Sequence, residues 1–308
     1  AMAESRPLLG NAGVVLRRVR SPFELARMLA TAGLPFPETR AEPTGLPRDG
    51  SWLVKKCYGS SGSGIRTLNG PGGLAATERG GPCHFQERID GPPGAAIFVA
   101  ADGTAQLLGI TRQFIGTSWT RAAAFQYAGS VGPWSLVRHA VEQIQSLGDM
   151  LAGEFGVRGL FGVDFVLSDG QIWVVEVNPR YAASVELVER ITGVPAMAWH
   201  VMACEGPVSG SLRPPLADPL LAGAVWGKAI LFAQRDVEVS AAFTAWCFEE
   251  NCDPLWPFIA DIPSAGERIA EGRPIATAFA EGESERDAIA RLKQRLAAME
   301  SNLYADSP

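Results

Sequence analysis

The segment that decides the fold of this chain is Asp164-Phe-Val-Leu-Ser-Asp-Gly-Gln-Ile-Trp-Val-Val-Glu-Val-Asn-Pro-Arg180. Its pattern predicts two antiparallel strands joined at an Asp-Gly turn, Asp169 and Gly170. Alternation along the second strand places Glu176 and Asn178 on one face, and Asp164 on the partner strand points to the same face. Two carboxylates, an amide oxygen and a nearby guanidinium on one rigid hairpin are suited to Mg²⁺ and phosphate.

This hairpin also has a simpler interpretation. Acidic residues that alternate with valines are typical of the solvated face of an antiparallel sheet, and Asp-Gly hairpins are common. The hairpin alone therefore does not identify a site. A second element upstream favours the functional interpretation.

The second element is a strand that ends in lysine and runs into a glycine- and serine-rich loop, Lys56-Cys-Tyr-Gly59-Ser60-Ser61-Gly62-Ser63-Gly64. Backbone N–H groups of such a loop can surround an anion while the lysine contributes a point charge. The loop is no Walker A motif, because its lysine precedes the glycines, and Thr67 stands where the dinucleotide fingerprint needs its third glycine. Taken alone, the loop is equally typical of a flexible hairpin tip.

Composition limits the classes of function. The chain has 308 residues, 47% of them hydrophobic, and a net charge of −6 without a Lys/Arg cluster, which argues against nucleic acid as a partner. Its five cysteines form no C-x-x-C pair, so neither a disulfide framework nor a zinc site is expected, and a reducing cytoplasm is the expected location. No run of about 18 apolar residues occurs, so we expect no membrane association.

Periodicity and turn residues predict an α+β chain. Helices are expected at residues 21–33, 136–155, 184–193, 196–205 and 284–303. Strands are expected at residues 52–56, 65–68, 84–89, 95–100, 105–114 and 224–232, in addition to the hairpin of residues 164–178.

The order of lysine strand, glycine loop, hairpins and Asp164…Glu176-x-Asn178-x-Arg180 resembles the ATP-grasp superfamily, in which two α+β lobes clamp ATP. The resemblance covers residues 8–205 and extends more weakly to about 305. It implies that Lys56 and the loop from Gly59 to Gly64 bind phosphates, that Asp164, Glu176 and Asn178 hold one or two Mg²⁺ ions, and that Arg180 is catalytic together with Lys56. It also implies that the segment joining the lobes contacts adenine, through Gln86, Glu87, Arg88 and Ile89, although a polar strand end of this composition is ordinary.

A narrower likeness is to carboxylate–amine ligases, including tyramine–glutamate ligase-like proteins. It is carried by residues 109–113, 127–133, 178–186, 260–263 and 272–275. Candidates for substrate contact are Arg112, Arg121 and Tyr127, for each of which a structural role is the alternative.

Three features depart from the family. Cys57 follows the lysine where proline or alanine is usual. The helix at 21–33 lacks the second phosphate lysine of many relatives, and Arg18 and Arg20 are the nearest cations. The family's N-terminal Rossmann-like domain is largely absent, so we expect either a shortened protein or a second chain, in a homo-oligomer or from a partner, that supplies that surface.

The predicted organisation is an N-terminal helix and linker (1–45), a small ATP-grasp lobe (46–103), a large lobe with the metal hairpin (104–205) and a small β-rich C-terminal module with a final helix (206–308). The resemblance implies an ATP- and Mg²⁺-dependent ligase that activates a carboxylate as an acyl phosphate and joins it to an amine, and an amino acid such as glutamate is the expected substrate. The alternatives are a biotin-carboxylase-like enzyme that activates bicarbonate and a nucleotide-binding protein without ligase activity.

Overall fold

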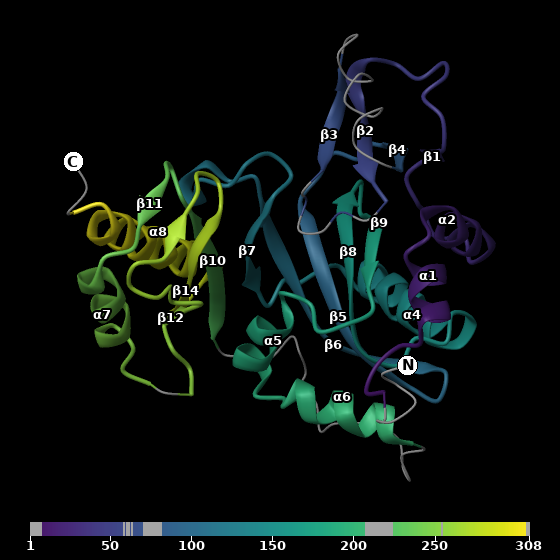
Figure 1. The fold of residues 1–308 in the computed structure, drawn as a ribbon. Helices are drawn as coiled ribbons and strands as arrows, with labels where there is room; N and C mark the ends of the chain where they lie inside the picture. The colour runs from purple at the N-terminus through teal and green to yellow at the C-terminus, as the bar shows by residue number, and fades with distance from the viewer. Residues whose placement is uncertain are drawn as a thin grey trace.

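The computed structural model describes residues 8–57, 59, 62, 64–69, 82–206, 224–253 and 255–305. Their strands form a four-stranded sheet, an eight-stranded sheet and a separate two-stranded pair (Figure 1). Helices cover both faces of the larger sheet. The α+β class predicted from the sequence is confirmed.

The smaller sheet is antiparallel, with the strand order β1-β4-β2-β3. Its strands are β1 (Thr39–Arg40), β2 (Asp49–Lys56), β3 (Ile65–Asn69) and β4 (Cys83–Glu87). A small buried cluster of Trp52, Val54, Leu68 and Phe85 lies on one of its faces. The face that carries Lys55 is thereby left for other contacts, because successive side chains of a strand alternate.

The larger sheet has the order β12-β14-β10-β7-β6-β5-β8-β9, and its neighbouring strands are antiparallel. Its strands are β5 (Pro93–Ala101), β6 (Thr104–Ile115), β7 (Tyr127–Gly132), β8 (Gly159–Ser168), β9 (Gln171–Asn178), β10 (Val225–Phe232), β12 (Ile259–Ala260) and β14 (Pro274–Gly282). The two-stranded pair is β11 (Val237–Glu238) with β13 (Arg268–Ile269).

Strand β5 shows how this sheet is buried on both faces. Ala96 and Phe98 join the core beneath α4 (Arg138–Glu154), whereas Ile97 and Val99 join the core with α5 (Val185–Thr192) and α6 (Ala196–Glu205). An almost continuous apolar run is the expected composition of a strand covered on both sides.

The N-terminal helices pack on the large lobe. Helix α1 (Gly13–Val19) and helix α2 (Pro22–Thr31) contribute Val19, Leu25 and Leu29 to the core that contains α4. As the sequence predicts, the hydroxyl of Ser21 caps α2 by accepting from the backbone N–H of Glu24 at 3.4 Å. Helix α1 was not predicted.

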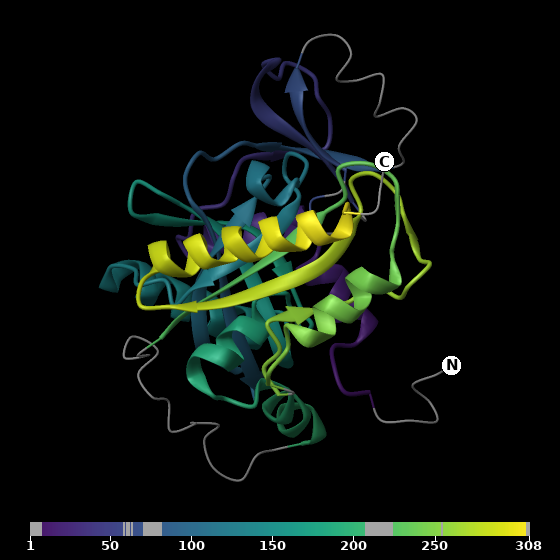
Figure 2. The ribbon, with the colours of Figure 1, turned by 90° about the vertical axis from the view of Figure 1, so that its left-hand side faces the viewer.

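The C-terminal segment shares the larger sheet with the residues before it, whereas the predicted organisation gives residues 206–308 as a small module of their own. Strand β10 pairs with β7 from Trp226 opposite Gly132 to Ala229 opposite Gly129, so the large sheet continues through it. Helix α8 (Glu285–Leu303) lies beside β14 across this part of the sheet (Figure 2), and α7 (Ala241–Glu249), which was not predicted, packs on α8.

The predicted boundary of the small lobe at residue 103 also differs from the structure, because β5 belongs to the large sheet. A short 3-10 turn, Ser118–Thr120, lies between β6 and β7. Among the described residues, no helix is long and apolar enough to span a membrane.

Candidate active site

A cleft of about 740 Å³ lies between the two sheets. Leu53, Lys55 and Gln86 line it from the small sheet, and Ala95, Gln113 and Asp164 line it from the large sheet. Its volume is in the range of small-molecule sites.

The β8–β9 hairpin forms one wall of this cleft. Its two-residue turn places Asp169 and Gly170 at φ values of 50° and 75°, as the mirror-image turn of a tight hairpin requires. Asp164 lies directly opposite Glu176, and the register then shifts so that Phe165 faces Val174. Val175 is the extra residue of this bulge, which turns Glu176 toward the cleft while Val174 stays in the core.

The three predicted metal ligands are brought together. The carboxylate of Asp164 accepts a hydrogen bond from the amide of Asn178 at 2.9 Å and another from Gln113 at 2.8 Å. Gln113 was not identified from the sequence, because its position depends on the pairing of β5 with both β6 and β8.

Burial of Asp164, followed by the negative charge of Glu176, raises the pKa of the Asp164 carboxyl from 3.8 to about 7. The negative charges of Asp164 and Glu176 repel each other in this partly buried place. A divalent cation bound between them would offset the repulsion. No group of three or more His, Cys, Asp and Glu side chains arranged for a metal occurs in the described part of the chain. Two carboxylates with an amide match Mg²⁺, which usually retains water and phosphate oxygens as its other ligands.

Lys55 is the lysine that faces the cleft. Its ammonium donates to the side-chain oxygen of Gln86 at 3.0 Å and to the carbonyl oxygen of the bulged Val175 at 3.4 Å. Burial lowers the pKa of this ammonium, and the charges of Glu176 and Asp164 oppose that effect.

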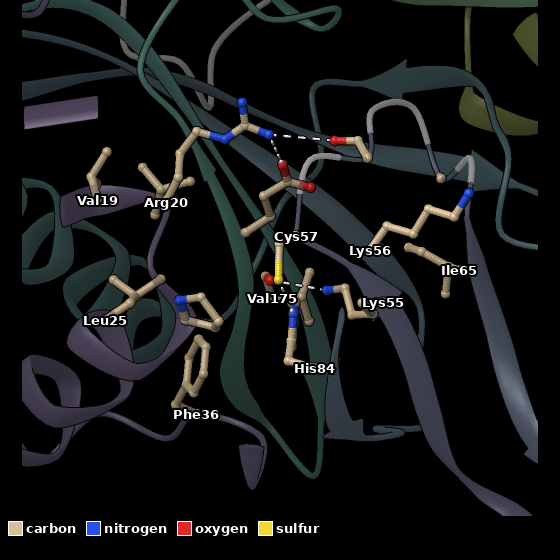
Figure 3. Close-up of a pocket in the computed structure, with 15 residues that line it drawn as sticks. Val19, Arg20, Leu25, Phe36, Lys55, Lys56, Cys57, Ile65, His84 and Val175 are labelled. Carbon is tan, nitrogen blue, oxygen red and sulfur yellow. Dashed lines mark hydrogen bonds and ion pairs between the residues drawn. The ribbon is translucent and has the colours of Figure 1, made fainter. Parts of the chain in front are cut away.

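Lys56, which the sequence analysis assigned to phosphate, does not line this cleft. Its side chain runs past Gly64, where an added Cβ would lie 2.7 Å from the Lys56 Cδ atom. Lys56 lines a smaller neighbouring pocket, where Figure 3 shows Lys55 and Lys56 pointing in different directions.

Arg20, immediately before α2, supplies a second cation. Its guanidinium lies 3.8 Å from a carboxylate oxygen of Glu176 and 3.4 Å from the carbonyl oxygen of Gly59 (Figure 3). Arg18, the other nearby cation, instead pairs with Glu24 and stacks on Phe155. Arg20 therefore faces the β8–β9 hairpin and supplies a positive charge there, although the chain lacks the second phosphate lysine of many relatives.

The glycine loop meets the large lobe. Gly59 and Gly62 line the cleft, whereas Ser60, Ser61 and Ser63 lie outside the described residues. Gly62 has a φ of 76°, and an added Cβ would lie 1.8 Å from the carbonyl oxygen of Phe125. Only glycine allows this approach of the two backbones.

The segment from Gln86 to Ile89 lines the cleft in full. Gln86 is buried, and its side chain is hydrogen-bonded to Lys55 and Thr39. Glu87 accepts from the backbone N–H of Glu38 at 3.3 Å, so this segment is a fixed edge of the cleft.

The predicted catalytic and substrate residues separate into two groups. Arg180 and Tyr127 line the cleft, and the Arg180 guanidinium lies 3.4 Å from the amide oxygen of Asn178. Arg112 and Arg121 are not among its described lining residues, because they pair with Glu285 and Glu300 of α8.

A lysine opposite a hairpin with two carboxylates, in a cleft between two sheets, defines a class of α+β proteins that clamp nucleotides. The family model described as the ATP-grasp domain matches residues 20–184, more than half of the chain. The chain belongs to the ATP-grasp family.

Relatives of known sequence or structure are distant. Formate-dependent phosphoribosylglycinamide formyltransferase of Mycolicibacterium smegmatis is 27% identical in an alignment over 215 residues that covers 62% of this chain and 50% of that protein. The chain thus spans half the length of this curated relative.

Two solved structures share the fold. L-amino acid ligase from Bacillus licheniformis has a TM-score of 0.73 at 17% identity, with 96% of this chain and 75% of that chain covered. The biotin carboxylase domain of Hydrogenobacter thermophilus 2-oxoglutarate carboxylase, solved with MgADP, ADP and bicarbonate, has a TM-score of 0.71 at 16% identity, covering 94% and 68%.

Proposed function

We propose that this protein is an ATP- and Mg²⁺-dependent ligase that activates a carboxylate as an acyl phosphate and joins it to an amine. The observation that carries the proposal is the convergence of Lys55, Asp164, Glu176 and Asn178 on one cleft between the lobes. Family membership and the fold shared with L-amino acid ligase support it.

In the proposed first step, a substrate carboxylate oxygen attacks the γ-phosphorus of ATP, and the bond to the bridging oxygen breaks to release ADP. In the second step, an amine attacks the acyl carbon, phosphate leaves, and the nitrogen loses a proton as the amide forms. Both small-molecule substrates bind in the cleft.

The chain's own residues position and stabilise these groups. Lys55, Arg20, Gly59 and Gly62 would bind the phosphates, and the segment 86–89 would contact adenine, since all of them line the cleft. Asp164, Glu176 and Asn178 would hold Mg²⁺, which supplies neutralisation of the charge on the phosphates. Arg180 stabilises the transferring phosphoryl group, since positioning and electrostatics carry most of phosphoryl transfer.

Tyr127 is the proposed contact for the second substrate. Its hydroxyl lies 2.9 Å from that of Ser130, and burial raises the pKa of the phenol, so it acts as a neutral hydrogen-bonding group. Arg112 and Arg121 have no part in this proposal because α8 engages both.

Bicarbonate activation is the second candidate, favoured by the nearly equal likeness to the biotin carboxylase domain. The test is incubation of the protein with Mg·ATP and pools of carboxylates and amines, with and without bicarbonate, while ADP and phosphate are followed. ADP release that needs both a carboxylate and an amine supports the ligase, and release that needs bicarbonate supports the alternative. Tight ATP binding without any turnover would identify a nucleotide-binding protein.

Glu176→Gln tests the assigned metal site. It preserves the shape of the side chain and removes one charge beside Asp164, so substrate-dependent ADP release should fall by about 100-fold or more. Glu142→Gln, on the outer face of α4, is the matched control. Retention of wild-type turnover by Glu176→Gln would contradict the site.

A further inference from the structure

A buried lysine from the C-terminal segment reaches the loop that carries Arg180. Lys228 lies on β10, outside the residues that the family model matches, and only 7% of it is exposed. It sits opposite Ser130 of β7 in the large sheet.

The ammonium of Lys228 has two acceptors. It donates to the carbonyl oxygen of Ala183 at 3.1 Å and pairs with a carboxylate oxygen of Glu186 at 3.2 Å. Ala183 belongs to the loop of residues 179–184, which connects β9 with α5, and it lines the cleft beside Arg180. Lys228 therefore holds the backbone of the loop of residues 179–184 without lining the cleft itself.

The end of this loop is also held by two other strands. The buried hydroxyl of Ser184 accepts a hydrogen bond from Thr111 of β6 at 3.1 Å and shares another with Ser130 of β7 at 3.2 Å. Three adjacent strands, β6, β7 and β10, thus fix the end of the loop at Ala183 and Ser184.

Glu186 is itself held by a second cation. Its other carboxylate oxygen lies 3.9 Å from the guanidinium of Arg190, whose side chain is 1% exposed. That guanidinium lies 3.8 Å from the ring centre of Phe279, the strand neighbour of Lys228. The carboxylate therefore has little freedom to leave Lys228.

A gain in folding stability does not account for the buried ion pair of Lys228 with Glu186. Removing a lysine from water costs free energy that its ion pair only partly recovers, and an apolar residue of similar volume often stabilises a fold equally well or better. The contact between Lys228 and the Ala183 carbonyl points instead to the geometry of the loop.

We propose that Lys228 is a positioning residue, which fixes the Ala183 carbonyl and thereby holds Arg180 in place for phosphoryl transfer. The inference rests on the proposed ligase function for the role of Arg180. The C-terminal segment then contributes to the site itself, although it lies outside the matched family region.

The test compares Lys228→Met, Lys228→Arg and the control Lys293→Met, which removes an exposed lysine of α8. Amide hydrogen exchange of residues 179–188 is measured against that of the β8–β9 hairpin, together with Mg·ADP affinity, melting temperature, and kcat and KM for ATP. We expect Lys228→Met to speed exchange in the loop by about tenfold, with the hairpin unchanged. We also expect kcat to fall by about 10- to 100-fold at an unchanged KM, because misplacement of a catalytic group acts on the transition state.

Lys228→Arg, which keeps a charged donor, should restore part of both properties, and Lys293→Met should match the wild type. Unchanged loop exchange in Lys228→Met would overturn the inference, and so would a lowered melting temperature with faster exchange throughout the chain. If the wild type releases no ADP with any substrate, the proposed function fails, whereas the exchange comparison still decides whether Lys228 positions the loop.

Discussion

Single residues set the electrostatics of the cleft. Asp164 and Glu176 face each other on neighbouring strands, and Lys55 approaches from the small sheet with its ammonium on the carbonyl oxygen of Val175. One side of the cleft thus concentrates negative charge and the other supplies positive charge. Such an arrangement suits a nucleotide whose phosphates bind a cation and a lysine together.

The adjacent lysines provide a test with a built-in control. Lys55→Met should weaken Mg·ATP binding by about 10- to 100-fold, because charge-assisted hydrogen bonds contribute roughly 1.5–3 kcal/mol. Lys56→Met should change the affinity by less than about threefold, since its side chain lies outside the cleft. Isothermal titration calorimetry measures both. A larger loss for Lys56→Met would restore the role that the sequence suggested.

The raised pKa of Asp164 predicts a pH-dependent stability. The pKa of Asp164 is about 7 in the folded protein, above the ordinary value of 3.8. Between about pH 4 and about pH 7 the folded protein therefore binds a proton that the unfolded chain does not, and the fold loses stability as the pH rises through this range. Asp164→Asn lacks this loss. Without Mg²⁺, the variant should melt above the wild type at pH 8, with a much smaller difference at pH 5.

Scanning fluorimetry across this pH range measures the effect, at roughly 2–4 °C for each kcal/mol. Added Mg²⁺ and ADP should raise the melting temperature of the wild type more than that of Asp164→Asn. A difference in melting temperature that is independent of pH would contradict the assigned burial of the charge.

Helix α8 ties the end of the large sheet to the loop between β6 and β7. Arg121 adopts a left-handed φ of 64° and forms two hydrogen bonds with the carboxylate of Glu300, at 3.0 and 3.1 Å. Arg112 of β6 pairs with Glu285 at the start of the same helix. These two ion pairs hold α8 against the large sheet. Of the three residues predicted to contact substrate, Tyr127 is therefore the one that lines the cleft.

Arg121→Ala should therefore destabilise the fold by less than about 1 kcal/mol, as expected for a partly exposed ion pair. Turnover and the KM values should remain within about twofold of wild type. Urea unfolding and steady-state kinetics measure the two effects, with Arg268→Ala as a surface control. A selective rise in the KM of one substrate would return Arg121 to the substrate site.

The whole molecule depends on a sheet that is continuous from β9 to β12. Ala128 and Val131 of β7 are buried in the same core as β10, β14 and α8. Residues 127–132 would become an unpaired edge without β10, and this core would be exposed.

Deletion of residues 207–308 should consequently abolish soluble folding, whereas an independent C-terminal module would leave a folded remainder. Soluble yield, dye binding to exposed apolar surface and the cooperativity of thermal unfolding measure the outcome. A soluble truncated protein that unfolds cooperatively and binds Mg·ADP would contradict the continuous core.

The sequence alone determined the features that depend on neighbours along the chain. The Asp169-Gly170 turn, the convergence of Asp164 with Glu176 and Asn178, the cap of Ser21 and five of the helices follow from turn chemistry, strand alternation and capping. The hairpin residues Asp164, Glu176 and Asn178, together with the lysine strand and the glycine loop upstream, carried the family resemblance, which the family model confirms.

Tertiary structure decided what depends on pairing between distant segments. A shift of one residue in a strand exchanges its two faces, so only the pairing of β2 with β4 shows that Lys55 faces the cleft and Lys56 does not. Likewise, only the order of strands in the large sheet brings Lys228 to the carbonyl oxygen of Ala183 and brings α8 to Arg112 and Arg121. Sheet order and register arise from long-range packing, which a local pattern of residues does not encode.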